Sequence, residues 1–428
     1  MSSEATGIDF TRETGSAALA GRGKFRRIDK HIWGIYIALV VISLIELYSA
    51  SSREVTAGHI LTPILRHAGL LAMGSLIMLG LQRVHYKVFY RLTWVIVGLS
   101  VLAALYTMFW GQVINGARRS FSVGLFSVQS SELLKFSAAL LIAKVLGDGQ
   151  VKENGKANVS NKAVATAAVS VLVFGAMLIN QGLTNTVLLM AISLSLMLIG
   201  GVSWKKFGIV LGVYALLGGG YYVYSHAKAS EKPKTETGSP YEVNRAKLRE
   251  DRMEYYFAKD KYNHPITSEN QQAQYSFIAQ ANGGVFGVGP GNSRETARLP
   301  LAFSDYIYAI IIEDGGLFAG LIVMALYLFL LARAGKVGMQ CKKVFATLLI
   351  IGMAVFIVYQ ALFHMAIVTG VFPVSGQPLP FISKGGSSVI ISSVALGIML
   401  SVSRYAARKN ENPTNDERSM ADNPMNKS

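Results

Sequence analysis

An aspartate at the edge of an apolar run is the residue in this sequence best suited to acid–base chemistry. Asp305 stands where a long polar stretch gives way to apolar residues from about 306. A carboxylate entering a membrane is costly unless it is paired or used. Partial loss of water raises the pKa of a carboxyl group toward the range of a general base. The simpler alternative is that Ser304 or Asp305 caps the following helix.

A second group of residues could hold phosphate. The candidate binding residues are Asn115, Arg118, Arg119, Lys384, Ser387 and Ser388. Guanidinium groups match phosphate oxygens with paired hydrogen bonds, and lysine supplies a point charge. A plain surface role for the arginines and a lysine that reaches up to the membrane surface remain open as alternatives.

Five acidic or basic residues stand in otherwise apolar stretches. Glu132 and Lys135 are three residues apart, so they predict a helix start with an ion pair on one face. Glu313 and Asp314 predict a structural ion pair with a basic partner, and Glu46 is expected to pair with a basic residue on a neighbouring helix. Of these residues, Glu132, Lys135 and Glu313 are expected to support the site, together with the glycines described next.

Glycines are dense between residues 281 and 293, including Gly283, Gly284, Gly287 and Gly289. Such a stretch could cradle a phosphate with its backbone. However, no Gly-Lys-Ser/Thr follows and no strand is expected before it, so neither a P-loop nor a dinucleotide-binding motif is supported.

The elements that position these residues must lie in a membrane. The chain has 428 residues, of which 51% are hydrophobic and 15% charged, a balance unlike that of a soluble domain. We therefore attribute the formal net charge of +16 to lysine and arginine residues in the loops of a membrane protein, and we expect no nucleic-acid partner. A single cysteine, Cys341, excludes an internal disulfide framework.

A helix needs about 20 mostly apolar residues to cross the hydrocarbon core. Ten stretches meet this requirement, and the two near 131 and 186 meet it least well. They lie near 32–50, 61–82, 89–110, 131–146, 163–180, 186–203, 207–224, 306–332, 344–370 and 384–403. The sequence therefore predicts an all-α, polytopic membrane protein with about ten transmembrane helices.

Lysine and arginine in the short loops set the orientation. These residues gather on the side of both termini, so both termini are expected to be cytoplasmic. We expect a cytoplasmic N-terminal segment at 1–30 without a cleavable signal, a transmembrane domain at 31–404, and a disordered cytoplasmic tail at 405–428.

The outer loops are unequal. The loop at 225–305, between helices 7 and 8, is much the largest, and its part from 241 to 261 predicts an amphipathic helix at the interface. The loops at 111–130 and 371–384 are moderately apolar and contain glycine or proline. That composition predicts re-entrant or cavity-lining backbone.

Several motifs in order, from about residue 31 to 405, resemble the SEDS family of bacterial shape, elongation, division and sporulation proteins (FtsW, RodA and SpoVE). They are Asn115-Gly-Ala-Arg-Arg, Gln129-Ser-Ser-Glu-Leu-Leu-Lys, Gly283-Gly-Val-Phe-Gly-Val-Gly, the stretch 305–313, and Pro378-Leu-Pro-Phe-Ile-Ser-Lys-Gly-Gly-Ser-Ser. Gly289-Pro-Gly-Asn-Ser looks more like the cell-division branch, FtsW, than the rod-elongation branch.

The resemblance implies a peptidoglycan glycosyltransferase that polymerises lipid II and releases undecaprenyl diphosphate at the outer face of the cytoplasmic membrane. It places the family's catalytic aspartate on Asp305. It also implies a class B penicillin-binding protein as partner, with other divisome proteins as further candidates. The charge of the leaving group would suit a divalent cation, magnesium or manganese, but no metal-ligand spacing is present in the sequence.

The sequence departs from the family pattern at supporting positions. The family's Pro-Glu-Ala-His-Thr-Asp is Pro-Leu-Ala-Phe-Ser-Asp at 300–305, and its Pro-Asp-Leu-Gly-Thr is Gly-Leu-Thr-Asn-Thr at 182–186. We read these as lineage drift, with a catalytically weakened member as the alternative. A lipid II flippase using Glu46, Glu313 and Asp314, and a non-catalytic scaffold for the transpeptidase, remain the competing functions.

Overall fold

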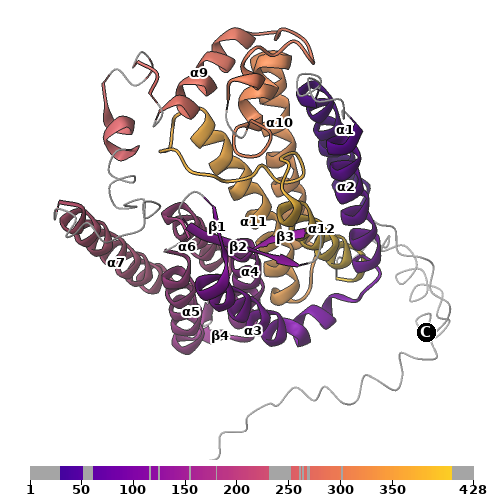
Figure 1. Ribbon diagram of the computed structural model, residues 1–428. Coiled ribbons are helices and arrows are strands. Elements are labelled where there is room, and N and C mark those ends of the chain that lie inside the picture. Colours follow the sequence, from indigo (N-terminus) through magenta and orange to yellow (C-terminus); the bar gives the residue numbers. More distant parts are fainter. Residues whose placement is uncertain are drawn as a thin grey trace, which may run out of the picture.

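The computed structural model of the protein (Figure 1) describes residues 29–51, 61–114, 117–123, 126–153, 156–179, 181–230, 252–259, 262, 265–267, 270–299 and 302–406. Long helices lie at all ten predicted stretches. They are α1 Lys30–Ser51, α2 Leu61–Leu81, α3 Tyr86–Trp110, α4 Ser130–Asp148, α5 Asn161–Ile179, α6 Leu183–Ile199, α7 Trp204–Ser230, α10 Ile307–Met339, α11 Val344–Val368 and α12 Gly386–Tyr405.

Six of these helices are long and apolar enough to cross a membrane within the described residues: α1, α3, α5, α10, α11 and α12. α2 and α6 contain shorter apolar segments, Leu65–Leu81 and Leu183–Ile199. The protein is therefore a mostly helical, multi-pass membrane protein.

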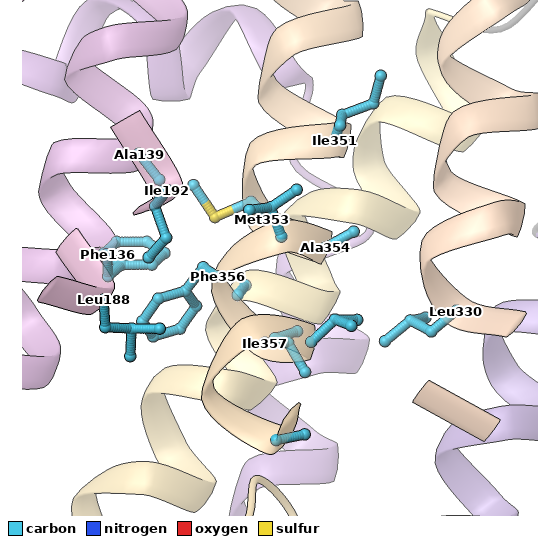
Figure 2. Close-up of a cluster of buried hydrophobic side chains, with 14 of the residues drawn as sticks. Phe136, Ala139, Leu188, Ile192, Leu330, Ile351, Met353, Ala354, Phe356 and Ile357 are labelled. Atoms are coloured by element: carbon cyan, nitrogen blue, oxygen red, sulfur yellow. The ribbon is translucent and has the colours of Figure 1, made fainter. Parts of the chain in front are cut away.

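The helix α11 forms the centre of the bundle. It is apolar on every side, and a helix of that kind has to be surrounded by other helices. Figure 2 shows Met353 and Phe356 of α11 packed against Phe136 of α4 and against Leu188 and Ile192 of α6. The two phenylalanine rings meet edge to face at 6.2 Å. The outer helices instead expose leucine and aromatic side chains, as expected of a surface in contact with lipid.

Two small antiparallel sheets correct the all-α prediction. Strands β1 Gln112–Ile114, β2 Ala117–Val123 and β3 Phe126–Gln129 form one sheet, in the order β1-β2-β3, and β4 Gln150–Glu153 pairs with β5 Lys156–Val159. In the first sheet, Ser120 pairs with Gln129 and Val123 with Phe126. The described residues at 111–130 thus satisfy backbone hydrogen bonds by strand pairing, which the sequence did not predict. Their re-entrant or cavity-lining position stays a prediction.

The outer segments contain short helices. α9 spans Gln271–Gly283, a 3₁₀ turn spans Glu295–Ala297, and residues 252–257 are helical. The predicted amphipathic helix at 241–261 is thus present at 252–257, while 241–251 and 260–261 lie outside the described residues, as do 1–28 and 407–428.

The segment at 371–385 has no regular helix, as its three prolines require. It is nevertheless largely buried, and Phe381 there has a positive φ of 66° and no exposed surface. The segment is thus packed inside the protein, and its predicted role as cavity-lining backbone stays a prediction.

Candidate active site

Asp305 lies just before α10, against the buried segment at 371–385. Two hydrogen bonds join the two chain segments: the Ser383 hydroxyl donates to the Ser304 carbonyl at 2.6 Å, and the Lys384 amide donates to the Phe303 carbonyl at 2.8 Å. The turn that carries Asp305 is therefore held before the aspartate by a segment some 80 residues further along the chain, and after the aspartate it continues into α10.

Gly376 makes room for the carboxylate. A Cβ on Gly376 would lie 2.7 Å from Oδ2 of Asp305 and 3.7 Å from Nη1 of Arg119. The carboxylate and the guanidinium thus converge on the same glycine, and any side chain there would displace the carboxylate. The resemblance did not single out Gly376, because the sequence shows only a glycine between serine and glutamine.

Burial raises the pKa of Asp305 above its ordinary value, while the positive charge of Arg119 and a hydrogen bond from Ser304 act in the opposite direction. The capping alternative is not supported, because the N-cap position of α10 is Tyr306 and no side chain caps it. The aspartate is therefore available for chemistry.

The other predicted phosphate ligands are only partly described. Arg118 lies in β2, paired with Val113, but its side chain and the whole of Asn115 lie outside the described residues. Lys384 is exposed, with its Nζ 5.9 Å from the centroid of the Phe303 ring. Arg119 thus lies beside Gly376, and Lys384 lies beside Phe303, two residues before Asp305.

Ser387 and Ser388 lie next to the carboxylate of Glu132. Ser388 is 2% exposed, so its hydroxyl lies inside the bundle. The structure therefore places these two serines closer to the buried network of α4 than to the outer surface.

Glu132 and Lys135 are almost completely buried, at 1% exposure each. The expected ion pair on α4 is not formed directly. Lys135 Nζ donates instead to Asn185 Oδ1 at 3.1 Å and to Gln377 Oε1 at 3.5 Å, and Glu132 Oε1 accepts from Gln360 Nε2 at 3.2 Å. The N-cap of α4 is Gln129, without a side-chain cap bond.

The network around Lys135 joins three helices to the 371–385 segment. Gln377 Nε2 donates to Asn185 Oδ1 at 3.1 Å, and the Gln377 carbonyl lies 2.6 Å from His364 Nδ1. Sequence reasoning missed Asn185, Gln360, His364 and Gln377. Each stands alone in an apolar or proline-rich stretch, and only the tertiary structure brings them together.

The glycine-rich stretch packs on α10 and forms no phosphate cradle. A Cβ on Gly283 would lie 1.9 Å from the Ile312 carbonyl oxygen, and one on Gly287, where φ is +80°, would lie 2.2 Å from the Asp314 carbonyl oxygen. Gly289 donates its amide to that same Asp314 carbonyl at 2.8 Å, while Gly284 has open space around it. Glycine is needed where the two backbones touch.

Glu313 fastens this stretch through its side chain. Its carboxylate accepts from the Ser293 hydroxyl at 2.5 Å and from the Arg294 amide at 2.9 Å. Asp314 accepts a hydrogen bond from the Ser49 hydroxyl, which in turn accepts from the Gly291 amide at 2.7 Å. The predicted ion pair for Glu313 and Asp314 is wrong, because the donors to these carboxylates are hydroxyl and amide groups, and Asp314 Oδ1 is buried without a partner among the described residues.

Glu46 is 6% exposed, and the charged group that acts on it electrostatically is Asp314. The expected basic partner on a neighbouring helix is therefore replaced, among the described residues, by a second acid.

A divalent cation finds no ready ligand set in the described part of the chain. No group of three or more histidine, cysteine, aspartate or glutamate side chains there is arranged to hold a metal ion.

Comparison with known proteins places the chain. A family model described as "Cell cycle protein", covering FtsW, RodA and SpoVE, matches residues 29–408. A probable peptidoglycan glycosyltransferase FtsW of Nitrosomonas europaea is 30% identical over 86% of this chain and 90% of its own length. A probable peptidoglycan glycosyltransferase FtsW of Polynucleobacter necessarius is 27% identical over 92% of this chain and 91% of its own length.

A solved structure of a peptidoglycan synthase complex that coordinates polymerization and crosslinking has the same fold. One of its chains matches 88% of this chain and 98% of its own length, with a TM-score of 0.66 and 22% identity. Residues 29–408, which the family model matches, include α10, the 371–385 segment and β2 around Asp305. Because that model covers nearly the whole helical part, the chain belongs to the FtsW/RodA/SpoVE family of cell cycle proteins.

Proposed function

We propose that the protein is a peptidoglycan glycosyltransferase that polymerises lipid II into glycan strands during cell division or cell-shape maintenance. Relatives that carry this activity in their names support the proposal. The structural observation that carries it is the partly buried Asp305 carboxylate beside Arg119, packed against a glycine that makes room for the carboxylate.

In the proposed reaction, the 4-hydroxyl of one sugar attacks the anomeric carbon of a second, lipid-linked sugar. The new glycosidic bond forms as the bond from that carbon to the diphosphate oxygen breaks, and undecaprenyl diphosphate leaves with the electron pair. Asp305 accepts the hydroxyl proton as general base. Its raised pKa makes it a better proton acceptor than an exposed aspartate.

Arg119, with Arg118 and Lys384, would stabilise the departing diphosphate. A guanidinium held near the reacting carbon stabilises negative charge as it develops on the leaving group. Arg119 lies close enough to Asp305 for the two charges to interact, so base and leaving-group site belong to one pocket.

We further propose that all ten long helices cross the cytoplasmic membrane, with both termini inside and Asp305 near the outer face. The charge distribution of the loops supports this orientation. A class B penicillin-binding protein would then meet the outer loop at 225–305, together with other divisome proteins.

The test is polymer formation from labelled lipid II by the purified protein, with and without its cognate transpeptidase. We expect wild type to form glycan strands and Asp305→Asn to form none while it still inserts and binds the partner. Asp148→Asn, at an exposed carboxylate on the far end of α4, is the matched control and keeps activity. Polymer from Asp305→Asn at the wild-type rate would remove Asp305 from the mechanism.

The flippase and the scaffold remain as outcomes of this test. Glu313 and Asp314 are taken up in hydrogen bonds to the glycine-rich stretch, which favours a packing role for them over a transport path. If neither wild type nor Asp305→Asn forms polymer with the partner present, but lipid II still moves across the membrane, the flippase is supported.

A further inference from the structure

Tyr306, directly after the proposed base, has a buried hydroxyl without a partner. The side chain is 2% exposed, and its hydroxyl makes no hydrogen bond within the described residues. Buried hydroxyls in folded proteins nearly always have a partner, from the protein, from water or from a ligand. The Tyr306 hydroxyl therefore points to a group that binds there.

Arg252 is the positive charge that acts on this hydroxyl. The Tyr306 hydroxyl interacts electrostatically with Asp305, Arg252 and Tyr255. Arg252 is partly buried and makes no hydrogen bond or ion pair in the described part of the chain. A half-buried guanidinium without a carboxylate is a ready site for an anion.

The short helix at 252–257 is held in place by two tyrosines. Tyr256 donates its hydroxyl to the Val371 carbonyl at 2.6 Å, and the Tyr255 hydroxyl accepts from Gln274 Nε2 of α9 at 2.8 Å. The first contact reaches the segment that also contains Gly376. Arg252 is thus fixed to the same framework as Asp305, although about 50 residues separate them in the sequence.

Arg252 and Arg119 serve different positions around the base. Arg119 acts on the Asp305 carboxylate itself, whereas Arg252 acts on the Tyr306 hydroxyl. The proposed reaction joins two lipid-linked molecules, and each carries a diphosphate. One cationic position cannot hold both groups.

We propose that Arg252 and the Tyr306 hydroxyl bind a phosphate oxygen of the lipid-linked acceptor, whose 4-hydroxyl attacks, while Arg119 serves the diphosphate that leaves the donor. This inference rests on the proposed function. Arg252 is then a binding residue of the outer loop that completes the site, and the substrate phosphate is the hydrogen-bond partner of the Tyr306 hydroxyl.

The test measures binding of fluorescent lipid II to the full-length protein in an Asp305→Asn background, which separates binding from turnover. Arg252→Gln and Tyr306→Phe should each weaken binding, by about tenfold or more for the arginine, as expected for a lost hydrogen bond to a charged group. Arg252→Lys should recover part of the loss. In the active protein with its partner, Arg252→Gln should raise KM more than it lowers kcat.

Matched controls lie nearby. Arg298→Gln removes an arginine that is 65% exposed and paired with Glu295, and Tyr308→Phe removes a hydroxyl that donates to the Gly320 carbonyl. Neither should change lipid II binding. Tyr306→Phe removes only an oxygen without a partner, so its thermal unfolding should match wild type, which shows that any loss of binding is not a loss of fold.

Two lipid environments distinguish substrate phosphate from a phospholipid head group. The weakened binding should be equal in neutral detergent without phospholipid and in vesicles that contain phosphatidylglycerol. An effect confined to the vesicles would assign Arg252 to head groups and overturn the inference, as would unchanged binding in both.

Failure of the proposed function looks different. If wild type binds lipid II but never polymerises it, the glycosyltransferase proposal fails while the binding shift still supports the role of Arg252. If wild type polymerises normally and the two variants bind and turn over like wild type, only the inference is overturned.

Discussion

Replacing Glu313 should release the glycine-rich stretch from α10. The carboxylate holds two good donors, the Ser293 hydroxyl at 2.5 Å and the Arg294 amide at 2.9 Å, and Glu313 has no exposed surface. In Glu313→Ala the Ser293 hydroxyl still has Thr296 Oγ1 at 2.6 Å, whereas the Arg294 and Glu295 amides lose their acceptor, at a cost of about 1–3 kcal/mol for each amide. We therefore expect the local stability to fall by about 2–6 kcal/mol.

Hydrogen–deuterium exchange of the amides at 288–295 measures this change directly. A loss of about 2 kcal/mol in the free energy of local opening accelerates exchange about 30-fold, so Glu313→Ala should exceed that value. Glu313→Gln keeps an oxygen for the Arg294 amide and can donate to Ser293, so it should lose about 1 kcal/mol and exchange about fivefold faster.

Glu254→Ala is the control, because this carboxylate is exposed on the helix at 252–257. It should leave exchange at 288–295 unchanged. Wild-type exchange rates in Glu313→Ala, or equal acceleration in Glu313→Gln and Glu313→Ala, would refute the reasoning that these hydrogen bonds fasten the stretch.

Two further predictions concern the same region. Gly287→Ala puts a Cβ 2.2 Å from a carbonyl oxygen of α10, at a residue whose φ is +80°. We therefore expect the protein to lose more than about 3 kcal/mol of stability and to be recovered poorly in folded form. The control Gly335→Ala, where the Cβ enters open space, should be recovered at wild-type yield. Asp305 must be ionised to act as a base, and its raised pKa means that kcat/KM falls, as pH is lowered, at a higher pH than an ordinary aspartate would give. Arg119→Gln removes the charge that opposes this rise, so the acid limb of the pH profile should move to still higher pH; an unmoved limb would contradict the assignment.

Local composition accounts for the helices. The apolar stretches near 89–110 and 344–370 became α3 and α11 nearly as predicted, because backbone hydrogen bonds inside a bilayer can be satisfied only within a helix or a closed barrel. The strands in the loop at 111–130 were not predicted. Its moderate hydropathy resembled buried backbone, whereas strand pairing between Ser120 and Gln129 decides its conformation.

For the charged residues too, the sequence predicts burial but not the hydrogen-bond partners. Glu313 was recognised as buried, but its partners are a hydroxyl and an amide about 20 residues earlier in the chain, which no local pattern reveals. Lys135 was expected to pair with Glu132, one turn away, yet its hydrogen bonds go to Asn185 and Gln377. Short-range spacing makes such pairs possible, and packing between helices selects the actual partners.

The sequence by itself determined that the chain is a mostly helical, multi-pass membrane protein of this family, and it singled out Asp305 as the candidate base, because hydropathy and motif order are written locally in the chain. Only the tertiary structure decided what surrounds that aspartate. Gly376, Arg119 and Tyr306 meet there from three separate segments, and the electrostatic environment of a carboxylate depends on neighbours in space.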